Sequence, residues 1–490
     1  MPSPGLYAQR RQEVPAGSSA TLSPDDLTGD FFMLRVRIDG RMLTTAQIQA
    51  LADISEQFAR GTADVTDRAN LQYHWVRAAD AEAIRQRLDA VGLQTTAEPG
   101  DCRRVVRESP VAGIAAAEAV DVRNAVSRIR ERYLADLTLA DLPRKFQTSV
   151  SWLADTTPEV NDVAFVGVEH PELGPGFDLL VGGGLSSSPR MAARLGVFVA
   201  PAELPEVWHA VVTLFRDHGL RHLGRRARMK YLVDAWGGER FREVLETAYL
   251  HRPLPDGPAA PVPDRAVDHV GVHAQRDGRH YVGFSTVAGR LSGPVLAKVA
   301  DAVQEAGSDR LRFTTHQKVL VFDVDPARVG ALVDRMDALG LPADPSPWRR
   351  SVMACTGREF CRLGVVETKQ RAVDLVEELE RRLGHLGLDQ PISIHLNGCP
   401  NSCARVQIAD IGLKGRVVTR GGVYAEGFQV QLGGGLGADA GPGRRVRSFD
   451  VASDELGDYV ERLVLRYLDS RADGEPFAQW AQRADESLLR

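Results

Sequence analysis

Two long stretches of this chain repeat the same order of sequence patterns. Residues 31–95 and 269–342 each begin with an alternating, strand-like run that ends in Asp-Gly, a common turn signal, and continue with helical spacing. Each then returns to a strand pattern after Asp-Arg and finishes with an amphipathic helix that stops at Gly-Leu. The following segments also share an order of strand, helix, strand and glycine-rich turn, LLVGGGL and VQLGGGLG. The repeat predicts two copies of a two-part unit.

A proline-rich stretch separates the two copies. Residues 251–267 read HRPLPDGPAAPVPDRAV, and proline removes backbone donors and favours an extended chain. We therefore expect a linker there. The expected limits are 1–96 and 97–250 for the two parts of the first copy, 251–267 for the linker, and 268–345 and 346–490 for the second copy. Both copies mix helices and strands without a steady βαβ rhythm, so the expected fold class is α+β.

Charge and hydropathy exclude several classes of protein. The formal net charge of −5 over 490 residues argues against general nucleic-acid binding, which favours a strongly basic chain. The N-terminus, MPSPGLYAQRRQEVPAGSSA, has no apolar core of the signal-peptide kind, and no apolar run approaches the roughly 18 residues of a membrane span. We therefore expect a cytoplasmic protein with no membrane partner. In that compartment clustered cysteines more often hold metal than form disulfides.

Four of the five cysteines lie in one region of the second copy. Cys355 and Cys361 are separated by five residues in ACTGREFCRLG, and Cys399 and Cys403 by three in NGCPNSCARVQIAD. Structural zinc sites use tighter pairs with two to four intervening residues, and inert buried cysteines rarely group in this way. Four thiolates without accompanying histidine pairs are typical of an iron–sulfur cluster. Small neighbours such as Gly357 and Gly398 leave room for a bulky inorganic core.

The two cysteine motifs resemble the signature of the sirohaem-dependent nitrite and sulfite reductase family, and most of all its actinobacterial ferredoxin-dependent sulfite reductase type. The resemblance extends from GLYAQR near the start to FAQWAQRADE near the end. It implies a pseudo-twofold duplication in which each copy is a ferredoxin-like half-domain followed by a sirohaem- or cluster-type domain. It also implies that Cys355, Cys361, Cys399 and Cys403 hold a [4Fe–4S] cluster, and that Cys403 bridges this cluster to the sirohaem iron.

An anionic substrate that loses oxygen as water needs positive charge around it. By resemblance, the residues that bind it are Arg35, Arg68, Arg104 and Lys145, all in the first copy. Sulfite reductases of the family usually carry Lys-x-Lys at the last of these positions, whereas this chain has Lys145-Phe146-Gln147. An amide at this second position is more typical of nitrite reductases. Because sulfite can carry two negative charges and nitrite one, Gln147 should weaken sulfite binding more than nitrite binding.

The macrocycle carries carboxylates and needs a cationic wall of its own. The segment GRRARMKYL offers Arg226, Arg228 and Lys230, which would share a face only if the segment were a strand. The resemblance adds Gln72 and His74 near the macrocycle, and Asn401 beside the cluster cysteines. The two GGG turns lack the G-x-G-x-x-G pattern of a Rossmann site, and we expect them to let the backbone approach a cofactor.

These observations favour a six-electron reduction of sulfite to sulfide, with nitrite reduction to ammonia as the alternative on the same centre. Two rival functions stay open: a precorrin-3B synthase-like enzyme, which the complete set of cations disfavours, and a simple iron–sulfur electron carrier. With no nicotinamide or flavin motif in view, a separate donor must supply the electrons, and the resemblance implies ferredoxin. Trp348, Arg349 and Arg350 are a candidate docking patch for it. We expect a monomer.

Overall fold

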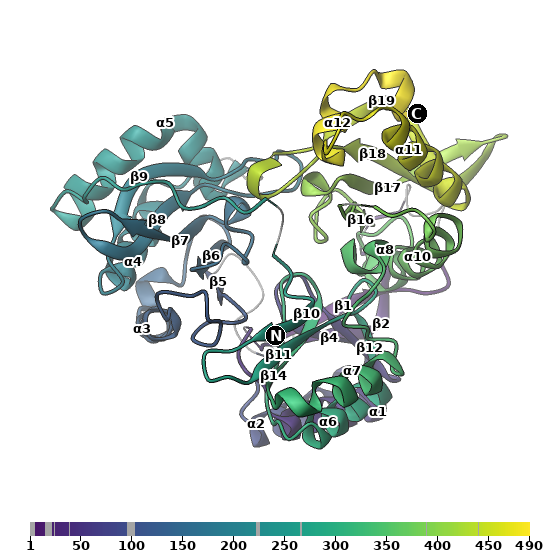
Figure 1. Ribbon diagram of the computed structural model, residues 1–490, viewed down its shortest axis with the longest axis horizontal. Helices are drawn as coiled ribbons and strands as arrows, with labels where there is room; N and C mark the ends of the chain where they lie inside the picture. Colours follow the sequence, from purple (N-terminus) through teal and green to yellow (C-terminus); the bar gives the residue numbers. More distant parts are fainter. Residues whose placement is uncertain are drawn as a thin grey trace.

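The computed structural model describes residues 5–14, 22–23, 25–38, 40–95, 103–221, 226–264, 267–388, 390–439 and 441–490, with the backbone alone for 103–105 and 133–135. Figure 1 shows three lobes: a larger domain of the first copy on the left, its counterpart at the upper right, and the two half-domains together at the bottom. Each lobe has its own buried apolar core.

The two half-domains have the same strand order. The sheets run β1-β2-β4-β3 and β10-β11-β14-β13. The first half-domain comprises β1 (Leu6–Arg10), β2 (Thr28–Val36), α1 (Thr45–Phe58), β3 (Thr62–Val65), β4 (Leu71–Val76) and α2 (Ala81–Ala90). The second comprises β10 (Gly271–Ala274), β11 (His280–Ser285), β12 (Arg290–Ser292), α6 (Gly293–Glu305), β13 (Leu311–Phe313), β14 (Lys318–Val324) and α7 (Val329–Asp337). After α2 and α7 the chain turns at Gly92 and Gly340, both with positive φ, as the Gly-Leu pattern predicts.

The half-domains are interlocked. Strand β12 of the second copy pairs antiparallel with β3 of the first, with Leu291 opposite Ala63, and so extends the first sheet to five strands. Helices α1 and α6 pack against each other, and one apolar core draws residues from both copies. Neither half-domain buries its apolar face without the other.

The larger domains also repeat each other. Their sheets run β5-β6-β7-β8-β9 and β15-β16-β17-β18-β19, and in both the first three strands are parallel and the last two antiparallel. The first comprises β5 (Arg103–Glu108), α3 (Arg123–Ala135), β6 (Phe146–Ser151), β7 (Val163–His170), β8 (Gly174–Val181), β9 (Ala193–Val199), α4 (Leu204–His218) and α5 (Met229–Val244). The second comprises α8 (Pro347–Ser351), β15 (Val352–Ala354), α9 (Gly357–Phe360), α10 (Lys369–Leu383), β16 (Ile394–Asn397), β17 (Ile411–Arg420), β18 (Val423–Leu432), β19 (Arg444–Ala452), α11 (Leu456–Ser470) and α12 (Phe477–Arg483). The predicted duplicated α+β architecture is confirmed.

Strand register and turn geometry match positions between the copies. In each large sheet, one residue from each of the three parallel strands pairs with the next across the sheet. These residues are Val106, Thr148 and Val163 in the first copy, and Val352, Ile394 and Ile411 in the second. In the hairpins before β4 and β14, Thr66 and Thr314 each donate their amide to the carbonyl four residues later. Left-handed residues at Ala154 and Thr157, and at Ser402 and Arg405, align the loops after β6 and β16. The resulting pairs are Arg68 with His316, Arg104 with Arg350, Arg107 with Met353, Lys145 with Pro391, Gln147 with Ser393 and Asp155 with Cys403.

The glycine-rich turns pack closely against neighbouring backbone, and the expectation that they approach a cofactor stays a prediction. A Cβ added to Gly183 would lie 2.5 Å from the carbonyl oxygen of Glu159, and one added to Gly434 would collide with the carbonyl of Gln407. Both carbonyls belong to short 3-10 helices or their edges, η4 (Pro158–Val160) and η8 (Val406–Ile408). Glycine is therefore needed at these turns for close packing of backbone on backbone.

Within the described residues, no helix combines the length and apolar character that crossing a membrane requires.

Candidate active site

The cysteine motifs meet at one edge of the second large sheet. Cys355 directly follows β15, and Cys399 and Cys403 follow β16. Because β15 and β16 are parallel neighbours, their carboxyl ends lie side by side, and the amide of Gly398 donates to the Cys355 sulfur at 3.2 Å. The side chain of Asn397 pins the second loop, accepting from the Ala404 amide at 2.7 Å. Two motifs about 40 residues apart in sequence thus form one site.

Backbone amides point at three of the four sulfurs. Gly357 and Gly398 donate toward Cys355, Leu363 and Gly364 toward Cys361, and Asn401 toward Cys399. Burial, and then the charges of neighbouring cysteines, nevertheless raise the pKa of all four thiols, that of Cys403 to about 11. Without a metal these sulfurs would be protonated at neutral pH, and a metal's positive charge is what would make them thiolates.

This arrangement fits an iron–sulfur cluster. Each thiol feels the charge of at least one of the others. Yet among the described residues no three histidine, cysteine or carboxylate groups converge as ligands of a single metal ion. Amides directed at the sulfurs are the groups that stabilise a thiolate-bound cluster and set its potential. The donor set is therefore that of a multi-iron cluster rather than of one zinc ion.

Cys403 differs from the other three cysteines in what it faces. It is the one thiol of the four whose residue has an exposed surface, although the protein atoms packed around it raise its pKa. The charged groups that act on it, apart from Cys355, are Asp67, Lys145 and Arg68. All three come from the first copy. The second copy thus supplies the thiols, and the first copy surrounds the outermost of them with cationic side chains.

Two glutamines orient arginines of this first-copy surface. The amide of Gln72, with its oxygen turned toward Arg35, accepts from Nη2 at 2.8 Å and Nε at 3.2 Å. The far end of the same amide lies 3.4 Å from the hydroxyl of Thr356, in the first cysteine motif. The amide oxygen of Gln147 accepts from both Nη atoms of Arg68. Gln147 is therefore placed with Arg68, and Gln72 with Arg35 at the border of the cluster loop.

The basic segment before α5 does not form a strand. Arg228 is the N-cap residue of α5, and its guanidinium pairs with Asp162 at 2.7 Å beside the amide of Gln147. Lys230 is buried and donates to the carbonyls of Gly184 and Leu185, so it holds the glycine-rich turn in place. Arg226 is exposed. Of the three cations, Arg228 is the one that the structure brings to the other site residues.

The remaining predicted residues lie in different surroundings. His74 is fully buried, stacks on Phe360 of the first cysteine motif with ring centroids 3.8 Å apart, and lies 3.5 Å from Asp64. His74 thus packs against the loop that carries the first cysteine motif. Asn401 is exposed and points its backbone amide at Cys399. The side chain of Arg104 lies outside the described residues.

The arginines considered for ferredoxin docking are engaged in ion pairs. Trp348 is buried, Arg349 pairs with Glu380 at 2.8 Å, and Arg350 pairs with Asp268 at 2.7 Å. These ion pairs join α8 to neighbouring elements, and a contribution of Arg349 and Arg350 to ferredoxin docking stays a prediction.

Sequence reasoning missed one cation. Arg107, near the end of β5, is only 6% exposed, and Arg68 is the charged residue that acts on it most strongly. The sequence did contain a sign of it. In the strand pattern RRVVRES, Arg107 directly follows Val106, which belongs to the core.

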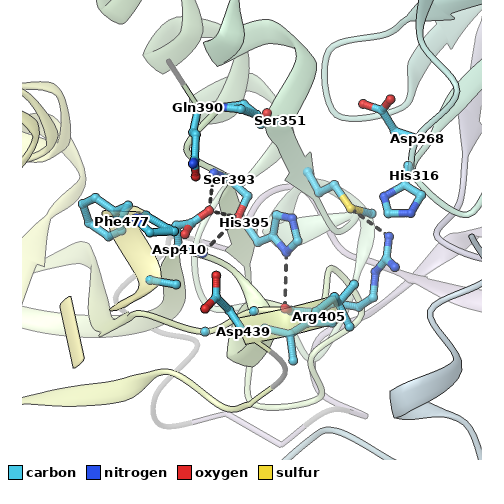
Figure 2. Close-up of a pocket in the computed structure, with 18 of the residues that line it drawn as sticks. Asp268, His316, Ser351, Gln390, Ser393, His395, Arg405, Asp410, Asp439 and Phe477 are labelled. Atoms are coloured by element: carbon cyan, nitrogen blue, oxygen red, sulfur yellow. Dashed lines mark hydrogen bonds between the residues drawn. The ribbon is translucent and has the colours of Figure 1, made fainter. Parts of the chain in front are cut away.

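A cavity of about 160 Å³ lies in the second copy, at positions that match the cationic residues of the first. Figure 2 shows Asp268 and His316 at one end of it, near the Arg405 side chain, and Asp410, Asp439 and Phe477 at the other. Its lining includes the matched positions His316, Arg350, Met353, Pro391 and Ser393. This cavity therefore lies at the pseudo-symmetric counterpart of the first-copy side chains that act on Cys403.

Comparison with known proteins agrees with this geometry. The nitrite and sulphite reductase 4Fe-4S domain matches residues 99–254 and 347–486, and the nitrite/sulfite reductase ferredoxin-like half domain matches residues 25–91 and 273–339. The chain is 52% identical over 489 residues to sulfite reductase [ferredoxin] of Mycobacterium tuberculosis strain H37Rv, covering 99% of this chain and 88% of that protein. It is 32% identical over 480 residues to the assimilatory ferredoxin-dependent nitrite reductase of Haloferax mediterranei, covering 92% and 82%.

A solved structure supports the same relationship. The Mycobacterium tuberculosis NirA protein superimposes with a TM-score of 0.96 at 51% identity, covering 99% of this chain and 90% of that one. Both repeated units and the region of all four cysteines are included in the family matches. The chain therefore belongs to the nitrite and sulfite reductase family, and is an oxidoreductase that uses a [4Fe–4S] cluster and sirohaem.

Proposed function

We propose that the chain is a ferredoxin-dependent assimilatory sulfite reductase, which reduces sulfite to sulfide with six electrons. The observation that carries this proposal is the position of Cys403, a cluster thiol that faces Arg68 and Lys145 of the first copy. An electron carrier would not need cations at this thiol, whereas a reductase of a small oxyanion does. The same cations disfavour a precorrin-3B synthase-like reaction, in which the tetrapyrrole itself would be the substrate.

Each group of residues has a distinct task in this proposal. Cys355, Cys361, Cys399 and Cys403 would hold the cluster, and Cys403 would also serve as a ligand to the sirohaem. The cofactors would supply the stored electrons, which side chains cannot provide. Arg35, Arg68, Arg104 and Lys145 hold the oxyanion; the guanidinium forks suit its planar edges, and Lys145 Nζ donates a proton toward an oxygen that leaves as water.

The other predicted residues act on those that touch substrate or cofactor. Gln72 orients Arg35, and Gln147 orients Arg68. Arg228 supplies the part of the cationic wall that reaches the site, and Lys230 holds the glycine-rich turn beside it. His74 packs on the first cysteine loop, and Asn401 donates its backbone amide within the second. Arg226, being exposed, is assigned to the outer rim of the macrocycle wall.

Two observations bear on the choice between sulfite and nitrite. The relatives at 52% identity are named sulfite reductases, and those named nitrite reductases are 32% to 34% identical. Gln147 is the feature that favours nitrite, because it is an amide in a position where a second positive charge would assist a dianion. We therefore assign sulfite as the substrate, with nitrite as the second candidate.

We further propose a cytoplasmic monomer that takes electrons from ferredoxin. One chain supplies both the thiols and the cations of the site, so no second copy is needed to complete it. Ferredoxin is the donor named for relatives that cover nearly the whole chain.

Reductant-driven turnover of sulfite and nitrite, measured side by side on the purified holoenzyme, tests the assignment. We expect sulfide to form with the higher kcat/KM for sulfite, and an absorption spectrum of iron isobacteriochlorin together with four irons per cluster. A protein that contains both cofactors but produces neither sulfide nor ammonia would refute the proposal, and a clear preference for nitrite would favour the second candidate.

A further inference from the structure

Arg107 is a buried cation that the family resemblance does not assign. It lies on β5 directly opposite Ser149 of β6, and Val106 before it packs into the apolar core. Because side chains alternate across a strand, Arg107 points to the face opposite the core. Phe146 and Val150 are also in the core, so Gln147 and Ser149 of β6 share that opposite face with Arg107. Arg107 therefore lies diagonally across from Gln147.

The surroundings of Arg107 leave its charge without a partner. Among the described residues no hydrogen bond or ion pair reaches its guanidinium, although its exposed fraction is 6%. The nearest carboxylates are already engaged, since Asp162 pairs with Arg228 at 2.7 Å and Asp67 lies 3.9 Å from Arg68. Glu108, the next residue, turns the other way toward Arg312. An arginine held away from water without a counter-ion is costly, unless an anion binds there.

The charged groups near Arg107 are the same ones that lie near Cys403. The charges that act on Arg107 are those of Arg68, Asp67, Arg405 and Asp162, and burial lowers its pKa to about 9. Arg68 and Asp67 also act on Cys403. The hydroxyl of Ser149, opposite Arg107, is likewise buried and unpaired among the described residues. A donor and a cation without partners thus occur together near the outermost cluster thiol.

The second copy has an uncharged residue at the position that matches Arg107. Met353 occupies the place of Arg107, and its sulfur lies 3.0 Å from Nη2 of Arg405. The methionine fills the same location on the strand with an apolar chain. The arginine is therefore not required by the fold of this sheet.

We propose that Arg107 is an additional substrate-binding cation, which supplies near position 147 the second positive charge that a dianionic sulfur oxyanion needs and that Gln147 lacks. This inference rests on the proposed function and extends it to substrate preference. It predicts that the amide at Gln147 does not by itself make the site selective for nitrite, since the charge comes from the neighbouring strand.

Equilibrium binding to the holoenzyme tests this directly. Sulfite and nitrite are titrated against the resting enzyme by absorption, with carbon monoxide on the reduced enzyme as a neutral reference ligand. In Arg107→Met, which copies the side chain of the second copy, the Kd of sulfite should rise about 10- to 100-fold, the range for a lost hydrogen bond to a charged group. The Kd of nitrite should rise less, and that of carbon monoxide should not change.

Further variants separate charge from structure. Arg107→Lys keeps the charge and should bind sulfite more tightly than Arg107→Met, and adding Gln147→Lys to Arg107→Met should recover part of the affinity. Arg128→Met, which removes an exposed cation from α3, is the matched control and should bind like the wild type. If Arg107→Met does not fold, the comparison of Arg107→Lys with the wild type still tests the role of the fork.

The possible failures can be told apart. Wild-type holoenzyme that binds neither anion would refute the proposed function itself. If the wild type binds sulfite and Arg107→Met binds it within about twofold, the assignment of Arg107 is wrong while the function stands. Loss of sirohaem from Arg107→Met, with unchanged sulfite affinity per remaining sirohaem, would overturn the assignment by showing that Arg107 holds a cofactor carboxylate instead.

Discussion

The two larger domains share one sheet topology but differ at the loop after the second parallel strand. In the second copy that loop carries Cys399 and Cys403. In the first copy the position of Cys403 is taken by Asp155, which accepts hydrogen bonds from Ser109 at 2.6 Å and Ser151 at 2.5 Å and lies 2.8 Å from His269. Burial alone would raise the pKa of Asp155, but these partners hold it below the usual value. In the first copy this loop position is therefore occupied by a hydrogen-bonded carboxylate, whereas in the second copy it carries a thiol available to a metal cluster.

At the positions that match Arg68, Arg107 and Lys145, the two copies differ in the opposite sense. The first copy places Arg68, Arg107 and Lys145 where the second places His316, Met353 and Pro391. Burial, and then the charge of Arg405, lower the pKa of His316 to about 3, so it is neutral at physiological pH. The counterpart of Arg104 is Arg350, whose charge is neutralised by Asp268 at 2.7 Å. The thiols lie in one copy and the cationic side chains in the other, and the proposed reaction site lies where the two meet.

Cys403→Ser should have the largest effect of any change on this comparison. Removing the thiol that faces the cations should lower sulfite turnover by more than about 100-fold, because even the outer partners of metal ligands affect activity 10- to 100-fold. Steady-state turnover and the magnetic coupling of the two iron centres measure the effect. A serine variant that retains coupling and activity would break the proposed division of roles between the copies.

Arg68→Met and His316→Gln test whether these matched positions differ in function. Arg68→Met should raise the KM for sulfite about 10- to 100-fold, since it removes a charge-assisted contact. His316→Gln changes the same position of the second copy and should leave the KM unaltered. Equal effects of the two variants would show that both matched positions take part in the reaction.

Asp410→Asn sharpens the comparison through stability. Asp410 corresponds to Asp162, but where Asp162 has Arg228 the second copy has Pro476, the N-cap residue of α12. Burial raises the pKa of Asp410 to about 6, despite hydrogen bonds from Ser393.

The sign of the resulting pH dependence follows from this pKa. The folded chain holds the proton more tightly than the unfolded chain, whose carboxyl titrates near pH 4. Stability is therefore lost as the pH rises toward 6 and is constant above it. The wild type should lose about 2 kcal/mol relative to Asp410→Asn between about pH 4.5 and pH 7.5. Urea unfolding of both proteins measures this difference, and a difference that is independent of pH would contradict the assignment.

Gln147→Lys should have the smallest effect. A lysine here adds a charge next to Arg68 and loses the hydrogen bond that Gln147 makes with it. We expect the ratio of sulfite to nitrite kcat/KM to rise about fivefold, equivalent to about 1 kcal/mol. Parallel assays with the two substrates measure the ratio, and no change would remove Gln147 as a discriminator.

Local sequence patterns predicted much of the fold and the cluster site. The Asp-Gly and Gly-Leu signals, helical spacing and strand alternation are short-range effects of backbone sterics and side-chain periodicity, and they revealed the duplication. Four cysteines in two motifs, with wider spacing than zinc pairs and no accompanying histidine pairs, identified a cluster. The exact domain limits stay predictions. Strand β12 of the second copy completes a sheet of the first, so the two half-domains are not separate in space.

Long-range packing decided the rest. The sequence by itself determined two copies, their elements and the four thiols. Only the tertiary structure showed that Cys403 faces Arg68 and Lys145, that Arg107 is left unpaired, and that Arg350 is neutralised by Asp268. The physical reason is that the effect of a charge depends on which groups lie within a few ångströms and how much water is excluded, and both are set by contacts between residues far apart in the chain.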